Sequence, residues 1–160
     1  SSVGGGIGLT EAAGVQVIWQ TGSNYYARMR EVVEAAATTL VRVMGFINRM
    51  DLAYAAADVI ITRAGAGTIS ELALVGKPVI LVPSPNVAED HQTHNAMALV
   101  DRGAALLVRD AEAQTELIPA ALDLLDDTAK RSSLSANIRQ MAIRDADEVI
   151  AREVLKLVGQ

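Results

Sequence analysis

Several features that mark particular protein classes are missing from this sequence. The chain contains no cysteine, which excludes disulfide bridges, thiolate nucleophiles and cysteine-bound zinc. No apolar run approaches the roughly 20 residues that a membrane-spanning helix needs. Arginine and lysine are dispersed, and the net charge of −5 argues against a nucleic-acid partner, because phosphate binding requires a basic face. We therefore expect a cytoplasmic domain without a transmembrane segment and without a nucleic-acid partner.

Aromatic residues are also scarce, at 3% of the chain, so alanine, valine, leucine and isoleucine must fill the core. Hydrophobic residues make up 51% and charged residues 21%, as in globular domains. Short β-branched runs alternate with longer helical patterns, which is typical of a parallel sheet with helices on both faces. No linker, repeat or low-complexity tract interrupts this alternation. We expect a single α/β domain over residues 1–160.

The apolar pattern predicts the order of the elements. Strands are expected over residues 15–19, 40–44, 59–62, 78–82 and 104–108. Helices are expected over 25–37, up to about 57, over 68–75 and 91–102, and in the tail over 118–125, 128–142 and 147–158. Gly76 and Gly103 follow two of these helices, at the position where glycine accommodates a left-handed backbone. Pro119 is expected near a helix start, where its missing N–H does little harm.

The amino-terminal segment does not fit this alternation. Its glycine cluster Gly4–Gly8 follows only Val3 as a remnant of a strand, and six residues separate it from the next strand. A parallel crossover needs a dozen or more residues, so no helix is expected there. We expect that Gly8 and Leu9 join segments that are not covalent neighbours in the full protein. An intact mass about 2 kDa above 16.9 kDa, roughly one helix of ordinary length, would support this expectation.

The strongest local signal is the segment Arg63–Glu71, between a buried strand and a helix. Its small residues allow a ligand close to the backbone, and the free N–H groups of a helix start favour an anion such as a diphosphate. An ordinary strand-to-helix turn, with Thr68 as the cap and Glu71 matched to the helix dipole, explains the spacing equally well. The segment is neither a Walker loop nor a dinucleotide fingerprint.

A second polar cluster, Glu89–Asn95, lies at the next strand-to-helix passage, so both clusters open onto the same edge of the sheet. Gln92 and Asn95 share a helical face and offer amide groups for sugar hydroxyls. His91 and His94 have the same spacing, but no third metal ligand stands at a fitting distance in the sequence. A metal is therefore not expected, and His94 is expected to be a solvated helix histidine. Nothing supports a serine–histidine nucleophile.

Three separated clusters resemble the carboxyl-terminal domain of the MurG family of UDP-N-acetylglucosamine (UDP-GlcNAc) transferases. They are Phe46–Met50, Asp58–Glu71, and Gly76–Pro78 with Pro83 and Asp90–Ala96. The resemblance runs from about Gly14 to the end of the chain and is most specific over residues 46–105. It implies a Rossmann-like parallel sheet that forms the carboxyl-terminal half of a GT-B glycosyltransferase.

The resemblance also implies roles for individual residues. Ile47 would contact uracil through its backbone, and Ala66, Gly67, Thr68 and Ile69 would lie along the nucleotide and diphosphate, with Ser70 beside them. Glu71 would bind the ribose hydroxyls, while His91 and Gln92 would reach the N-acetylglucosamine. Gly4–Leu9 resembles the family's glycine loop, with Gly6 in place of a phosphate-binding serine, so this contact would be weakened.

The implied parent is an inverting hexosyltransferase of peptidoglycan synthesis, which moves N-acetylglucosamine from UDP-GlcNAc to lipid-linked muramoyl-pentapeptide (lipid I to lipid II). It needs no cofactor or bound metal. The acceptor-binding amino-terminal half and its general base lie outside this sequence, so the chain alone is expected to be inactive. The parent is expected to be peripheral on the cytoplasmic face of the bacterial inner membrane. Alternatives are a non-catalytic UDP-sugar-binding or partner-dependent module and a related GT-B enzyme such as a UDP-GlcNAc epimerase.

Overall fold

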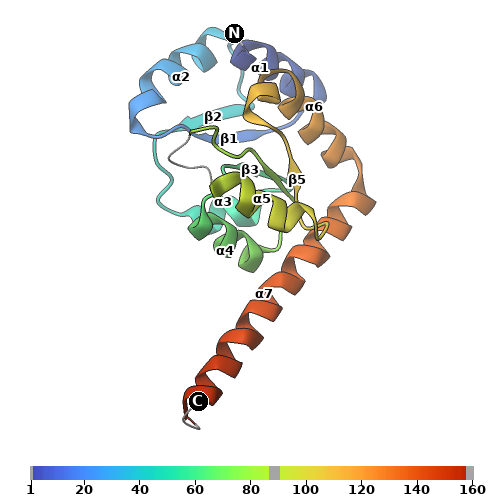
Figure 1. Ribbon diagram of the computed structural model, residues 1–160. Helices are drawn as coiled ribbons and strands as arrows, with labels where there is room; N and C mark the ends of the chain where they lie inside the picture. The colour runs from blue at the N-terminus through green and yellow to red at the C-terminus, as the bar shows by residue number, and fades with distance from the viewer. Residues whose placement is uncertain (1, 87–90, 158–160) are drawn as a thin grey trace.

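Helices and parallel strands alternate along the chain in the computed structural model (Figure 1). It describes residues 2–86 and 91–157, with side chains for 8–86 and 91–142. The strands are β1 (Val17–Gln20), β2 (Val41–Met44), β3 (Ile60–Thr62), β4 (Val79–Leu81) and β5 (Leu106–Leu107). The helices are α1 (Ser2–Ala13), α2 (Ser23–Ala35), α3 (Met50–Ala56), α4 (Ala66–Val75), α5 (His91–Val100), the 3-10 turn η2 (Asp110–Glu112), α6 (Ala113–Asp126) and α7 (Thr128–Leu157).

The strands form two separate parallel sheets. β1 pairs with β2 in the register Val17 to Val41, while β4 lies between β3 and β5. Among the described residues, no strand joins β1 to β3. The mass test of the Gly8–Leu9 junction stays a prediction.

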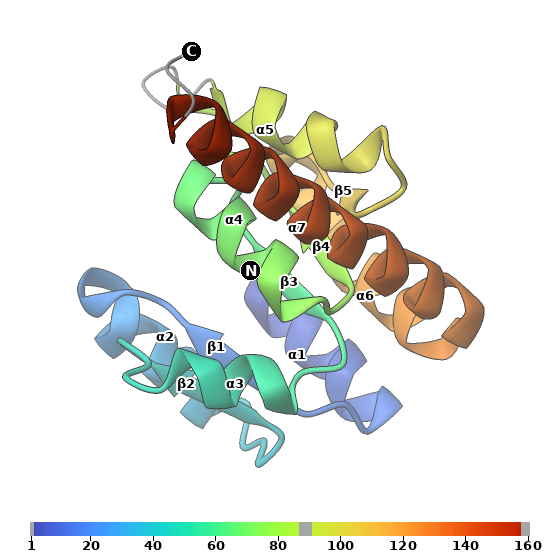
Figure 2. The same cartoon turned by 90° about the horizontal axis from the view of Figure 1, so that it is seen from below.

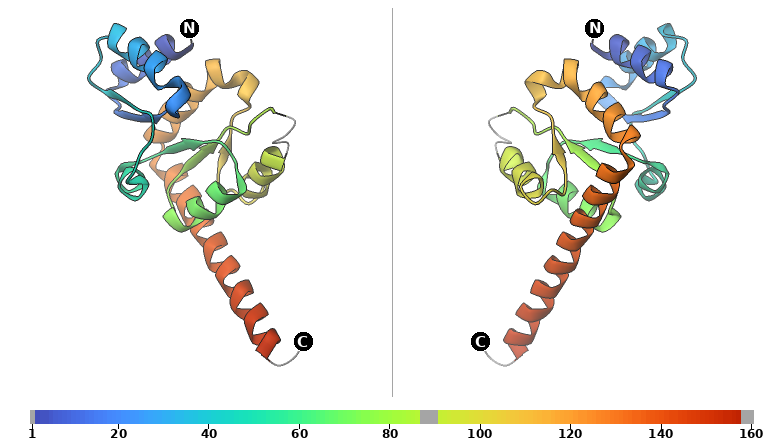
Figure 3. Two further views of the ribbon diagram at one scale, coloured as in Figure 1. Left: turned by 90° about the vertical axis from the view of Figure 1, so that its left-hand side faces the viewer. Right: turned by 90° about the vertical axis from the view of Figure 1, so that its right-hand side faces the viewer.

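Helices cover both faces of the β3–β4–β5 sheet, as expected. On one face Val79 and Leu81 pack with residues of α4, α5 and α7, including Leu72, Leu99 and Ile138. On the other face Ile80 packs with residues of α6 and of the first turns of α7. Figure 2 shows α7 running alongside α4 and α5, and in Figure 3 its carboxyl-terminal part projects away from the body. Because side chains alternate between the two faces of the sheet along β4, this fully buried strand contributes to both apolar cores.

The β1–β2 sheet has a much smaller core, formed around Val33 and Val41. Helix α2 packs on β2, and α1 packs against α2 and α6. The predicted glycine loop is wrong, because Gly6 lies inside α1 rather than in a passage from strand to helix, and the expectation that no helix lies between these glycines and the first strand is wrong as well. The helix satisfies the backbone groups of its interior through its own hydrogen bonds.

Two boundaries in the second half of the chain also differ from expectation. Helix α6 begins at Ala113, so Pro119 lies inside it and not near its start. The two last predicted helices are one helix, α7, without a break between residues 142 and 147. The glycine predictions are confirmed: Gly76 has a φ of 69° directly after α4, and Gly103 has a φ of 65°.

Candidate functional site

The carboxyl end of β3 leads directly into helix α4, and this passage forms the centre of the candidate site. Gly65 is the N-cap residue, with a φ of −64° and a ψ of 147°, and α4 begins at Ala66. The first intrahelical bond runs from the Ile69 N–H to the Gly65 oxygen at 3.0 Å. The N–H groups of Ala66, Gly67 and Thr68 thus precede the first intrahelical donor and face the end of the helix that favours anions.

Two details of this passage differ from the sequence prediction. The helix starts two residues earlier than expected, so Thr68 is its third residue and makes no capping hydrogen bond. Ser70 and Glu71 consequently lie in the second turn and not in the first. The Ser70 hydroxyl donates to the Ala66 oxygen at 3.4 Å, which ties it to the helix itself. The explanation of this segment as a threonine-capped turn is therefore wrong.

Glu71 is exposed on α4 and lies near the Tyr54 hydroxyl of α3. Burial raises the pKa of the Tyr54 phenol, and the negative charge of Glu71 raises it further. Tyr54 itself packs against the main apolar core, so its position is held by the fold. An exposed carboxylate beside a fixed phenol is a suitable acceptor for two neighbouring ligand hydroxyls.

Helix α5 approaches this passage through two amide side chains. Gln92 is 7% exposed, and its Oε1 accepts the N–H of Ala64 at 3.3 Å and that of Ser84 at 2.9 Å. Asn95 Nδ2 donates to the Ala64 oxygen at 3.2 Å. The two amides that the sequence assigns to sugar hydroxyls are therefore engaged, at least in part, with the backbone of the neighbouring loops.

Arg63 connects the loops at the same edge of the sheet. Its Nη1 donates to the Val82 oxygen at 3.3 Å and to the Asp110 Oδ1 at 2.7 Å, and it approaches the Pro83 oxygen at 3.5 Å. The ion pair is partly exposed, so its contribution to stability is at most about 1 kcal/mol. Its geometric effect is larger, because one guanidinium joins the segments that follow β3, β4 and β5.

Ile47 lies in the loop after β2, next to the exposed Phe46. Its N–H donates to the Gln20 Oε1 at 2.9 Å, so the backbone group that remains for a base is the carbonyl oxygen. Gln20, at the end of β1, thus orients this loop. Neither Gln20 nor the anchoring role of Arg63 was predicted from the sequence, although each residue ends or directly follows a strand, where ligand loops begin.

His91 and His94 are both exposed on α5. Glu89 and Asp90, which belong to the same predicted cluster, lie outside the described residues. Among the side chains that the structure describes, at 8–86 and 91–142, no group of three histidine or carboxylate residues comes together as a set of metal ligands.

The family-like cluster Gly76–Pro78 lies away from these loops, at the opposite edge of the sheet. Lys77 Nζ donates to the carbonyl oxygens of Ala55 and Ala57, at 3.2 Å and 3.0 Å, at the end of α3. Gly76 ends α4 in the left-handed conformation. This cluster therefore stabilises two helix ends.

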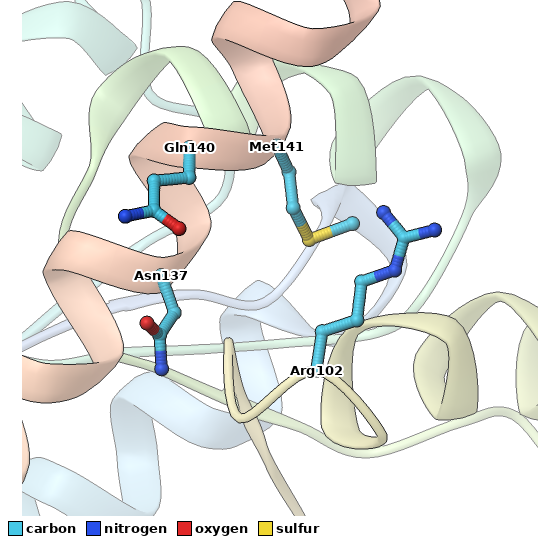
Figure 4. Close-up of a pocket in the computed structure, with 4 residues that line it drawn as sticks. All are labelled: Arg102, Asn137, Gln140 and Met141. Carbon is cyan, nitrogen blue, oxygen red and sulfur yellow. The ribbon is translucent and has the colours of Figure 1, made fainter.

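Two of the cavities on the described surface are not lined by the predicted donor residues. One, of about 290 Å³, is bordered by Arg102 and by Asn137, Gln140 and Met141 of α7 (Figure 4). The other, of about 370 Å³, lies where Lys77 and Pro78 meet the start of α7. The predicted donor residues are instead on the open edge formed by the carboxyl ends of the strands.

A family model described as the glycosyltransferase family 28 C-terminal domain matches residues 7–151. A protein of Bacteroides fragilis named UDP-N-acetylglucosamine--N-acetylmuramyl-(pentapeptide) pyrophosphoryl-undecaprenol N-acetylglucosamine transferase is 55% identical over 147 residues, which are 91% of this chain and 39% of that protein. A protein of Parabacteroides distasonis with the same name is 48% identical over 99% of this chain and 43% of its own length. This chain thus spans about two fifths of the length of these relatives.

Solved structures agree with the family match. The crystal structure of Acinetobacter baumannii MurG superposes with a TM-score of 0.68 at 29% identity, over 86% of this chain and 41% of that one. The spinosyn forosaminyltransferase SpnP matches with a TM-score of 0.53 at 18% identity, over 91% of this chain and 44% of that one, and supports the fold alone. The GT-B type of Rossmann-like domain predicted from the sequence is thereby confirmed.

Proposed function

The chain belongs to the glycosyltransferase family 28 C-terminal domain family, and from this membership we propose that it is the donor-binding domain of an inverting UDP-GlcNAc transferase. The observation that supports this proposal most is the passage from β3 to α4. Its three leading N–H groups lie at the start of α4, where Ala66 and Gly67 are exposed, and the exposed Glu71 lies one turn further along the same helix. That arrangement suits a nucleoside diphosphate, with the diphosphate at the helix start and the ribose at the carboxylate.

In this proposal each part of the donor meets a different element. The uracil lies at the Ile47 carbonyl, and the N–H groups of Ala66, Gly67 and Thr68 hold the diphosphate. His91 and the amide nitrogen of Gln92 face the N-acetylglucosamine. As the bond to the anomeric carbon breaks, negative charge grows on the leaving UDP, and the helix start stabilises it without a metal ion.

The acceptor and the general base belong to the rest of the parent protein. We propose that the acceptor is the lipid-linked muramoyl-pentapeptide named in the relatives, whose hydroxyl attacks the anomeric carbon while the general base takes its proton. The exposure of Gly67, Glu71 and His91 supports this division, since a second half can close over them. The parent would then work at the cytoplasmic face of the inner membrane. No helix within the described residues is long and apolar enough to cross a membrane.

A second candidate is a binding module that depends on a partner chain. The two separate sheets favour it, because β1 and β3 each keep a backbone edge without a strand partner among the described residues. Both candidates bind the nucleotide sugar, but only the second requires another chain for that binding.

Calorimetric titration of the chain with UDP-GlcNAc, UDP and UDP-glucose tests the proposal. We expect binding of UDP-GlcNAc and UDP, with UDP-glucose weaker than UDP-GlcNAc. Binding that appears only after a partner chain is added would favour the second candidate. No binding of any of the three ligands under either condition would refute both.

A further inference from the structure

A polar cavity of about 370 Å³ lies at the edge of the main sheet that is opposite the candidate donor site. It is formed where residues in front of β3 and β4, among them Asp58 and Lys77, meet the first turns of α7. None of the residues that the sequence assigns to the donor lines it. We call it the basic cavity, after its three cationic side chains Lys77, Arg131 and Arg139.

The charge of the basic cavity is opposite to that of the whole chain. Three cations and one carboxylate, Asp58, line it, whereas the chain carries a net charge of −5. Among the described side chains, no ion pair joins Asp58 or any other carboxylate to these three cations. The fold therefore leaves the positive charge of the cavity without close neutralisation, and a concave surface of one sign attracts ligands of the other.

Arg131 has a buried donor that the fold does not satisfy. Its Nη2 donates to the Thr128 Oγ1 at 3.3 Å, but its Nε is buried and has no hydrogen-bond partner. A buried donor on a charged group is costly to leave unpaired, so such an atom calls for an acceptor. An anion bound in the basic cavity would supply that acceptor.

Helix α7 presents several donors to the cavity in a fixed order. Arg131, Ser135 and Arg139 are spaced by four residues, so they form one row along the helix. The neighbouring Leu134 and Ile138 are 1% and 0% exposed and pack in the two cores of the main sheet. This burial fixes the rotation of α7, and with it the side of the helix from which the polar row projects.

The cluster Gly76–Pro78 holds the other side of the cavity. Lys77 Nζ donates to the Ala55 and Ala57 oxygens at 3.2 Å and 3.0 Å, so its ammonium group has a defined position. The side chain of Arg139 lies so close to Gly76 that a Cβ there would overlap it. Glycine at this position thus allows the guanidinium to lie beside Lys77.

We propose that the basic cavity binds a phosphate group, either as inorganic phosphate or as the phosphate of a small organic monoester. Three cations and one carboxylate leave two positive charges, which match the roughly two negative charges of a phosphate. Its several oxygens also suit the three hydroxyl groups of the lining better than a carboxylate does. These hydroxyls belong to Thr128, Ser132 and Ser135.

The volume of the cavity agrees with such a ligand, since pockets for small molecules have about 300–1,000 Å³. Because the cavity shares no residue with the donor edge, this inference does not rest on the proposed function.

An amide-resolved NMR titration of the chain with inorganic phosphate, at constant ionic strength, tests the inference. We expect saturable changes in chemical shift at Lys77, Arg131 and Ser135. Arg139→Gln should lower the affinity about tenfold, the size of losing one hydrogen bond to a charged group. Lys130→Gln is the matched control, because it removes the same charge from the adjacent turn at an exposed residue outside the lining. Its affinity should stay within about twofold of the wild type, since a distant exposed charge is screened.

A further variant and a further ligand complete the test. If Arg139→Gln does not fold, Ser135→Ala replaces it, with an expected loss of about threefold for one neutral hydrogen bond. Glycerol 3-phosphate distinguishes the two sources of the phosphate. Binding tighter than that of inorganic phosphate assigns the cavity to an organic monoester, and equal or weaker binding assigns it to the inorganic ion.

Three results would overturn this inference. The first is a linear response up to roughly 10 mM phosphate, which is weaker than a specific site requires. The second is an equal loss of affinity in Arg139→Gln and Lys130→Gln, which would show general attraction without a site. The third is a set of shifts confined to Ala66–Thr68, which would exclude the basic cavity and leave the donor site in place.

Discussion

Gln92→Met is the substitution whose effect on stability the structure determines most directly. Methionine has nearly the same length and volume as glutamine, but its thioether is a poor acceptor for the two backbone N–H groups that Gln92 now satisfies. Because the side chain is only 7% exposed, water has little access to replace the lost oxygen. The variant therefore isolates the hydrogen bonds from the packing.

The magnitude follows from the two donors. A buried N–H without an acceptor costs about 1–3 kcal/mol, and two of them set an upper limit near 6 kcal/mol. The Ala64 bond is long at 3.3 Å, and Ser84 is only half-buried, so both contributions belong near the lower end. Methionine also regains up to about 1 kcal/mol of apolar burial. We expect a net loss of about 2 kcal/mol in the free energy of unfolding.

Urea unfolding followed by far-ultraviolet circular dichroism measures this loss. With an m-value of about 2 kcal/mol per M, the midpoint should fall by roughly 1 M. Gln114→Met, an exposed glutamine in the first turn of α6, is the control and should change the midpoint by less than about 0.3 M, as surface substitutions usually do. A Gln92 variant as stable as this control would show that its oxygen does not hold the two loops.

Four further predictions follow from other parts of the chain. Glu71→Ala should weaken UDP binding by about 1–3 kcal/mol in calorimetry, and unchanged affinity in a folded variant would remove the ribose assignment. Gly76→Ala should lower the free energy of unfolding by at least about 1–2 kcal/mol, because alanine is strained at a φ of 69° and its Cβ would overlap the Arg139 side chain. A neutral result in urea unfolding would contradict that contact. The absorbance titration of the phenols should show a step above pH 10 that Tyr54→Phe removes and Glu71→Gln shifts to lower pH. Since the pKa of Tyr54 is raised in the folded state, the associated stability is present below about pH 10 and is lost as the pH rises through the pKa of the folded state. A Tyr54 step at or below the ordinary pKa of tyrosine would contradict the burial. The fluorescence of Trp19, which reports on the small β1–β2 sheet, should change at lower urea concentration than the circular dichroism, whereas coincident transitions would show that the two sheets unfold together.

The order of the elements was predictable because each strand of the main sheet has a distinct apolar run. Val79, Ile80 and Leu81 are all fully buried, which is the pattern that a covered parallel strand produces in a sequence. The ends of the helices and strands were less predictable. Helix α4 starts at Ala66 rather than at Thr68, since a helix start depends on the turn in front of it as well as on the capping residue.

The candidate site was predictable in its location but not in its internal contacts. The two polar clusters do meet at one edge, as parallel strands require. However, an amide suits a sugar hydroxyl and a backbone N–H equally well, so the sequence cannot show that the Gln92 oxygen binds Ala64 and Ser84. The same holds for Gln20, whose partner Ile47 lies 27 residues away.

The glycine-rich start shows a different limit. Gly4–Gly8 fits a phosphate loop only if a complete strand precedes it, and that strand is a property of the neighbouring sequence rather than of the glycines. In the described structure the segment lies within α1, packed against α2 and α6. A local motif without its structural context was therefore insufficient to place Gly6.

The most direct test of the donor site is an amide-resolved NMR titration of the chain with UDP-GlcNAc. We expect the largest changes in chemical shift at Ala66, Gly67 and Thr68, with smaller changes at His91 and Gln92. The signals of Asn137 and Gln140, which line the cavity beside α7, should not move. Changes centred on that cavity, or saturable binding that leaves Ala66–Thr68 unaffected, would contradict the assignment of the α4 start as the diphosphate site.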